Sequence, residues 1–239
     1  MNLPLFYTAD ADAGQTTITL DEDTSKHVVN VLRMKKGQKL QLTNGQGHLW
    51  LTEIVNDHKK HCEVQVLQED FVSRTGRETC IAISLLKNTS RFEWFLEKAT
   101  ELGIRRIIPT ICDRTEKQHL RYDRMQAIVV SAMLQSQQLW MPALHQPVGL
   151  GLLLKQHDMI DYTQKFIAHC AEGNKKHLNS LINTSLPSQL ILIGPEGDFS
   201  SEEIAFAAEH YFIPVSLGET RLRAETAGVA AAVMLTQAQ

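Results

Sequence analysis

The sequence has few cysteines and no long apolar run, and both absences narrow what the protein can be. Four cysteines among 239 residues lie far apart and form no CxxC pair, so we expect reduced thiols in the cytoplasm and no zinc site. No apolar run is long enough to cross a membrane, and the first residues lack the pattern of a secretory signal. The sequence has no obvious acidic metal cluster either, and we expect no bound metal.

Acidic residues are missing from one stretch, 24–51, although the whole chain has a formal net charge of −3. The overall charge argues against a nucleic-acid binder, whereas this stretch carries basic charges only. A surface that faces a polyanion and an ordinary solvated surface are equally good interpretations. The basic residues are Lys26, Arg33, Lys35, Lys36 and Lys39.

Residues 1–72 alternate polar and apolar side chains in short runs, which predicts a small β-barrel domain. We expect one helix among the strands, with Asp23 as its N-cap and an apolar stripe formed by Val28, Val31 and Leu32. The predicted strands are 16–20, 38–43, 49–55 and 62–67, with turns at Asn44-Gly45 and Asn56-Asp57.

In residues 73–239, predicted strands and helices alternate along the chain. This order predicts an α/β domain with a mainly parallel sheet, preceded by a polar linker at 73–79. The predicted strands are 81–86, 107–111, 166–169 and 189–193. One predicted helix begins with a capping box at Ser90–Glu93, has a buried stripe of Phe92, Phe95, Leu96, Ala99 and Leu102, and ends at Gly103; another runs from Tyr122 to Leu139.

Two apolar runs near the C-terminus end at glycine and are each followed by a helix. One run enters Gly194-Pro195-Glu196-Gly197 before a capping box at Ser200 and Glu203, and the other enters Gly218. Loops at the ends of parallel strands line ligand sites. Neither loop has the lysine of a Walker motif or a GxGxxG pattern, so a nucleoside-sized pocket lined by backbone is favoured over a phosphate cradle. For the first loop alone, an ordinary strand-to-helix turn is the better interpretation.

The second of these helices is rich in small residues and contains Gly228. Glycine is unfavourable inside a helix, so we expect a close contact with a neighbouring element there.

Motifs spread over nearly the whole chain point to one family. They are His27, Val31-Leu32-Arg33 and Gly37, then Lys87, Lys98–Gly103, Pro109 and Arg114, then Gln135-Ser136 and Pro142, and finally Gly194–Gly197, Leu217-Gly218 and Leu222–Ala227. Together they resemble the SPOUT methyltransferases, and within them the RsmE family of 16S ribosomal RNA uridine N3-methyltransferases.

The chain departs from that family's pattern in three places. Asp198 stands where a second glycine usually follows GPEG, and no arginine occurs in 4–7. In the family's EQSGR segment, Leu134 replaces the acid and Gln137-Gln138 replaces Gly-Arg. These last two departures concern RNA contacts more than cofactor binding.

The resemblance implies a PUA-like β-barrel followed by an α/β SPOUT domain with a mainly parallel sheet and a C-terminal trefoil knot. It also implies a homodimer that binds S-adenosyl-L-methionine in the knot and acts on 16S rRNA of the small ribosomal subunit. The implied cofactor-binding residues are His169, Ile193, Gly194, Pro195, Glu196, Gly197, Leu217, Gly218, Leu222, Arg223 and Thr226.

Methylation of uridine N3 requires removal of a proton and stabilisation of the resulting anion. Arg223 is our candidate for the stabilising cation, and Glu225 or Glu196 for the base; helix capping and ion pairing are the alternative roles of both acids. The candidate RNA-binding residues are Lys26, His27, Arg33, Lys35, Lys36 and Arg114.

Two other functional classes remain open from the residues. One is a non-catalytic RNA-binding module that kept the fold, and the other is an enzyme that acts on nucleotide phosphates. The cofactor motifs argue against the first class. The lack of a Walker lysine argues against the second.

Overall fold

The computed structural model describes residues 3–156, 159 and 161–237. The chain divides into two compact units. The first comprises Met1–Thr75 together with Met133–Met141, and the second comprises Gly76–Ala132 together with Pro142–Gln239.

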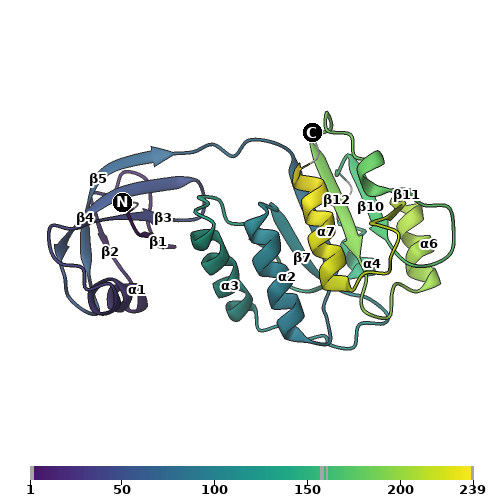
Figure 1. Ribbon diagram of the computed structural model, residues 1–239, viewed down its shortest axis with the longest axis horizontal. Coiled ribbons are helices and arrows are strands. Elements are labelled where there is room, and N and C mark those ends of the chain that lie inside the picture. Colours follow the sequence, from purple (N-terminus) through teal and green to yellow (C-terminus); the bar gives the residue numbers. More distant parts are fainter. Residues whose placement is uncertain (1–2, 157–158, 160, 238–239) are drawn as a thin grey trace. The chain divides into compact units, whose positions relative to one another are not determined.

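The first unit is built on a five-stranded sheet, shown in purple and blue in Figure 1. The spatial order is β1-β3-β4-β5-β2, and its pairs are antiparallel except for the parallel pair β1 and β3. Its core surrounds the fully buried Trp50. The four predicted strands are confirmed, and β1 was not predicted. The turn predicted at Asn44-Gly45 lies in the connection between β3 and β4, whereas Asn56 is the last residue of β4 and the connection to β5 covers residues 57–62. The strands are β1 (Leu5–Tyr7), β2 (Thr17–Thr19), β3 (Lys39–Thr43), β4 (His48–Asn56) and β5 (Glu63–Phe71).

The helix of this unit differs from the prediction. Its N-cap is Asp21 rather than Asp23, because the Asp21 carboxylate accepts the backbone N–H groups of Asp23 and Thr24. After α1 (Glu22–Lys26) the chain continues as the π-helical turn η1 (His27–Val31).

The apolar stripe predicted for this helix is also wrong in part. Val28 is buried as expected, but its buried companion is Val29, while Val31 and Leu32 are 66% and 44% exposed. A π-turn contains an extra residue relative to an α-turn. Residues beyond it are therefore rotated away from the face that the 3.6-residue period predicts.

The second unit contains an eight-stranded sheet in which every pair is parallel. Strand β12 lies between β6 and β10 although it follows both in the sequence, and β9 pairs with β7 beside β8. The predicted α/β architecture with a parallel sheet is confirmed. The strands are β6 (Glu78–Ser84), β7 (Arg106–Ile111), β8 (Ala143–Leu144), β9 (Val148–Gly149), β10 (Gln164–Ala168), β11 (Lys176–His177), β12 (Ser188–Ile193) and β13 (Ile213–Ser216).

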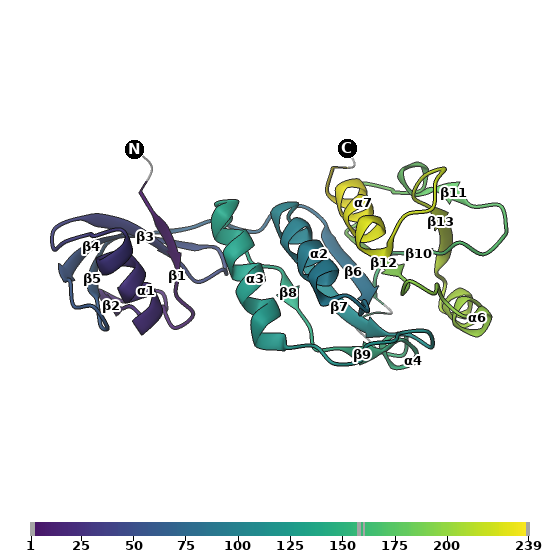
Figure 2. The same cartoon turned by 60° about the horizontal axis from the view of Figure 1, so that its bottom comes forward.

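Helices cover both faces of this sheet. On one face α2 and α7 lie side by side, as Figures 1 and 2 show. On the other, α4 and α6 pack against a cluster that includes Ala82, Leu192 and Phe199. None of the helices among the described residues is long and apolar enough to cross a membrane. The helices are α2 (Thr89–Glu101), α3 (Tyr122–Gln135), α4 (Leu150–Leu153), η2 (Leu178–Ser180), α6 (Ser201–Glu209) and α7 (Ala224–Gln237).

Two predicted helix ends need correction. The N-cap of α2 is Asn88, whose side chain accepts the N–H of Ser90 at 2.9 Å, so Ser90 lies inside the helix. Helix α3 ends at Gln135 rather than Leu139, because Gln137 adopts a φ of 55° that no α-helix can continue. The predicted end of α2 is confirmed at Gly103, which has a φ of 81°.

Gly228 of α7 lies against α2 and β6, as expected from its place inside a helix. A Cβ there would lie 2.7 Å from the ring of Phe95 and 3.0 Å from the side chain of Ile83. Both side chains are fully buried. The missing side chain therefore allows α7 to approach its neighbours closely.

We expect Gly228→Ala to lower the free energy of unfolding by about 1–3 kcal/mol, because overpacking outweighs the better helix propensity of alanine. Denaturant unfolding would measure the change. Gly151→Ala is the matched control: Gly151 lies in α4 with nothing within 4 Å of its Cβ position, so that variant should be as stable as the wild type or more so. Equal stability of Gly228→Ala and the wild type would contradict the close contact.

Candidate functional site

A cavity of about 790 Å³ opens at the carboxyl ends of β10, β12 and β13, in the second unit. Its volume falls within the range of small-molecule sites. The loops that follow the three strands form its wall. Nine residues predicted to bind the cofactor line it, namely His169, Ile193, Gly194, Pro195, Glu196, Leu217, Gly218, Leu222 and Arg223.

Two further residues of that prediction do not line the cavity. Thr226 is exposed on the first turn of α7. Gly197 faces Arg114, whose guanidinium donates to the Gly197 carbonyl at 2.9 Å. A Cβ on Gly197 would lie 3.3 Å from Cβ of Arg114, so glycine lets this arginine approach the loop.

The Gly194–Gly197 loop is a tight turn with little freedom. The N–H of Asp198 donates to the Pro195 carbonyl at 2.9 Å, and Asp198 takes a left-handed φ of 65°. A Cβ on Gly194 would lie 3.1 Å from the buried ring of Phe199. A side chain at position 194 would therefore crowd the ring of Phe199. The left-handed φ at position 198 is one that glycine adopts without strain.

Asp198 joins this loop to the end of β10. One carboxylate oxygen accepts the N–H of Cys170 at 2.7 Å, and the other accepts the N–H of Phe199 at 2.8 Å. Aspartate tolerates left-handed backbone better than most residues because its side chain bonds locally. At position 198 the aspartate allows the turn to form, and its hydrogen bond to Cys170 links two walls of the cavity.

A third loop contributes residues that the sequence analysis did not single out. Cys170 and Lys175 line the cavity after β10. The Lys175 ammonium donates to the carbonyls of His169 and Ala171 and so holds this loop in a closed shape. Cys170 and Lys175 could have been recognised as site residues because they follow a predicted parallel strand. The carboxyl ends of such strands share one edge of the sheet.

His169 lies in the cavity wall with both ring nitrogens buried and without a hydrogen-bond partner among the described residues. Burial lowers the pKa of the imidazole, and the Lys175 cation lowers it further, against a smaller opposing effect of Asp198. The ring is therefore neutral near pH 7 and can accept or donate a hydrogen bond to a ligand.

The two candidate bases lie in different environments. Glu196 is exposed and lines the cavity, and its carboxylate accepts the N–H of Lys87 at 3.1 Å. Glu225 is buried outside the cavity lining, 3.5 Å from the Arg91 guanidinium. Arg223 is exposed in the wall and forms no ion pair within the described part of the chain. The arrangement places Arg223 and Glu196 at one cavity and Glu225 apart from it.

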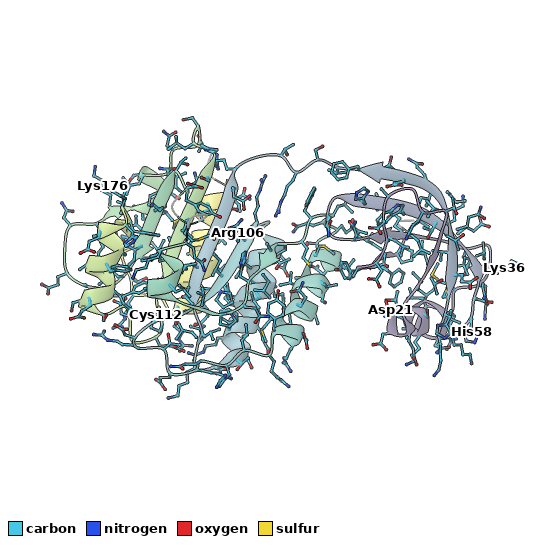
Figure 3. All side chains as sticks on the ribbon, turned by 180° about the vertical axis from the view of Figure 1, so that it is seen from behind. Asp21, Lys36, His58, Arg106, Cys112 and Lys176 are labelled. Carbon is cyan, nitrogen blue, oxygen red and sulfur yellow. The ribbon has the colours of Figure 1, made fainter. Side chains whose placement is uncertain are left out.

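Most of the candidate RNA-binding residues lie on the first unit. Lys26 pairs with Glu22 at 2.8 Å, which raises its pKa, and Lys35 pairs with Asp57 at 3.5 Å. Arg33 and Lys36 are exposed and form no ion pair among the residues described, and Lys36 projects from its unit in Figure 3. The sixth residue, Arg114, belongs to the second unit. His27 is also exposed, and its ring lies edge-on to Phe6.

Comparison with known proteins defines the class first. A family model described as an RNA methyltransferase domain matches residues 74–236, and one described as an RNA methyltransferase PUA domain matches residues 20–67. The two matches define an RNA methyltransferase with a PUA domain.

Individual relatives narrow this class. The ribosomal RNA small subunit methyltransferase E of Synechocystis sp. is 31% identical over 89% of this chain and 70% of its own length. The protein of the same name from Rickettsia conorii is 29% identical over 92% of this chain and 89% of its own length. The chain belongs to the family of ribosomal RNA small subunit methyltransferases E.

A solved structure agrees with this membership. It is a ribosomal RNA small subunit methyltransferase E from Neisseria gonorrhoeae bound to S-adenosyl methionine, with 27% identity and a TM-score of 0.86. The match covers 99% of this chain and 98% of that one. No group of three or more potential metal ligands occurs among the residues described here.

The position of Asp198 leads to a prediction about stability. Asp198→Ala should lower the free energy of unfolding by about 2–3 kcal/mol, because it removes both hydrogen bonds and leaves alanine in a left-handed conformation. Asp198→Gly should be less damaging, since glycine accepts this φ, and Asp198→Asn should be the mildest, since it keeps one acceptor. Denaturant unfolding would give the order. If Ala and Gly variants were equally stable, the backbone argument would be wrong.

Proposed function

We propose that this protein transfers a methyl group from S-adenosyl-L-methionine to N3 of a uridine in 16S rRNA of the small ribosomal subunit. The observation that carries the proposal is the cavity, in which His169, the Gly194–Glu196 turn and Arg223 come together on three strand-end loops. Membership of the family gives the substrate class.

The residues of the cavity suit this cofactor. The glycine turns expose backbone amides and carbonyls that can hold a nucleoside, and His169 brings two ring nitrogens that lack partners in the described structure. When bound, S-adenosylmethionine would supply an activated methyl group on a sulfonium centre. The chain's task is then to position the acceptor base and to manage its proton.

Arg223 and Glu196 are the residues that we assign to this task. Arg223 would stabilise the negative charge that forms on the carbonyl oxygens of uridine when N3 loses its proton. Glu196 is favoured over Glu225 as the proton acceptor, because only Glu196 lines the cavity and is exposed. Glu225 has the burial and the partner of a structural residue, with its carboxylate against Arg91.

RNA binding is assigned to the first unit. Arg33 and Lys36 are exposed cations without an acidic partner in the described residues, and we propose that they contact phosphates. Lys26 and Lys35 would exchange their present carboxylate partners for phosphates. His27 would add a contact beside them. Arg114 of the second unit would contribute only through the guanidinium nitrogens that do not donate to the Gly197 carbonyl.

The homodimer and the trefoil knot of the family stay predictions. For the dimer, the outer faces of α2 and α7 offer a surface, since Trp94 and Val233 are 43% and 41% exposed. We also propose that the protein acts in the cytoplasm, because its proposed substrate belongs to the small ribosomal subunit.

The test of the function is mass spectrometry of 16S rRNA from a strain that lacks this protein. N3-methyluridine should be missing at one position and should return when the purified protein and S-adenosylmethionine are added. Calorimetry with S-adenosylmethionine separates this proposal from a non-catalytic RNA-binding module, which would bind RNA but not the cofactor. An unchanged methylation pattern would reject the assigned substrate.

Arg223→Ala should lower kcat by about 100-fold, because the variant loses the cation that stabilises the uridine anion. Turnover is measured at saturating S-adenosylmethionine, with calorimetry to show that the cofactor still binds. Arg221→Ala is the matched control, since Arg221 is also exposed in the cavity wall and has no assigned role. A folded, cofactor-binding Arg223→Ala variant with unchanged turnover would remove Arg223 from the mechanism.

A further inference from the structure

Val31 and Leu32 form an exposed apolar tip at the end of the helix in the first unit. Their exposed fractions are 66% and 44%, although both are large aliphatic side chains beside the well-packed Val28 and Val29. A regular α-helix would place Val28 and Val31 on one face, three residues apart. The apolar tip is thus outside the core of its own unit.

The local backbone is what presents this tip. The N–H of Leu32 donates to the carbonyl of His27, five residues back, which is the bond of a π-turn. Arg33 follows with a left-handed φ of 56°, and the N–H of Met34 closes the helix end on the carbonyl of Val28. Helix ends of this kind usually use glycine at the left-handed position. Here that position carries a long cation next to the apolar tip.

Basic residues follow the apolar tip in the sequence. Arg33, Lys35 and Lys36 follow it directly and are exposed. Two ion pairs, Lys35 with Asp57 and Lys60 with Glu22, hold the lysine- and histidine-rich turn between β4 and β5 beside the same helix. In Figure 3, Lys36 and His58 both lie on this unit. Asp57 and Glu22 offset part of this positive charge, but the exposed Arg33 and Lys36 have no acidic partner among the described residues, and they complement a polyanion rather than an apolar protein surface.

We propose that the apolar tip packs against unstacked bases of the RNA while the neighbouring cations hold its phosphates. This inference rests on the proposed function and deepens it by naming a base contact within the RNA-binding surface. Unpaired bases offer apolar faces that a paired A-form helix hides, and proteins recognise RNA mainly through such bases. Aliphatic side chains beside basic ones can contact the exposed base faces of single-stranded RNA better than those of a duplex.

The test compares binding to two fluorescent probes, a single-stranded oligouridylate and a GC-rich RNA duplex of equal length. The full-length variant Val31→Ser/Leu32→Ser should bind the single strand about tenfold more weakly, because apolar contact area is lost. Duplex binding should change less than about twofold, and the dependence of affinity on salt should stay that of the wild type. Neutralising Arg33, Lys35 and Lys36 together should instead weaken binding to both probes and flatten the salt dependence.

Leu67→Ser/Val72→Ser is the matched control, since these two side chains are 45% and 48% exposed on the same unit but outside the basic stretch. This control should bind both probes like the wild type. Val31→Ile/Leu32→Met, which keeps the apolar character, should also retain binding to the single strand.

Unchanged single-strand affinity of Val31→Ser/Leu32→Ser would overturn the proposal. So would a loss confined to cosedimentation with small ribosomal subunits, because the apolar tip would then contact a folded feature of the subunit rather than unstacked bases. Failure of the proposed methylation is a separate outcome, detected by mass spectrometry of 16S rRNA with the wild-type protein. The binding comparison can therefore fail or succeed independently of it.

Discussion

The parallel pairing of β10 and β12 is the constraint on which the site depends. Because all strands of the second unit run in one direction, their carboxyl ends meet at one edge of the sheet. Strand β12 lies between β6 and β10, both of which precede it in the sequence. That insertion brings the Gly194 turn beside the loop after β10, and β13 adds Gly218 from the other side. A cavity lined largely by backbone follows from this order.

The same insertion requires close packing on the faces of the sheet. Ile191 and Ile193 of β12 turn toward α7, while Leu190 and Leu192 face the cluster under α4 and α6. The strand is buried on both faces and so carries a continuous apolar run. Helix α7 can cover one face closely because it is made largely of small residues, among them Gly228 beside Phe95. The cavity wall is thereby supported from behind by a tightly packed core.

The sequence allowed β12 and β13 to be predicted together with the loops that follow them, because glycine at the end of an apolar run is a local signal. The short strands β1, β8, β9 and β11 were not predicted. It did not allow the exposure of Val31 and Leu32 to be predicted, because a π-turn leaves no periodic trace and the spacing matched an ordinary helix. The burial of Glu225 was missed for a different reason. Its position in the first turn of α7 is readable, but the side of the helix that faces Arg91 is fixed only by packing against α2. The loop of Cys170 and Lys175 was missed since nothing in its composition marks it.

Two departures from the family's glycine pattern fall at left-handed positions of the backbone. Gln137 and Asp198 stand where the family's pattern has glycine, and they adopt left-handed φ values of 55° and 65°. A non-glycine residue in that conformation costs about 1–2 kcal/mol. At Asp198 the two hydrogen bonds to Cys170 and Phe199 offset that cost. The left-handed turn at position 198 is therefore kept without glycine because the aspartate side chain bonds to its neighbours. The absence of glycine from a motif position is thus no sign that the site is lost. It indicates that other interactions hold the turn.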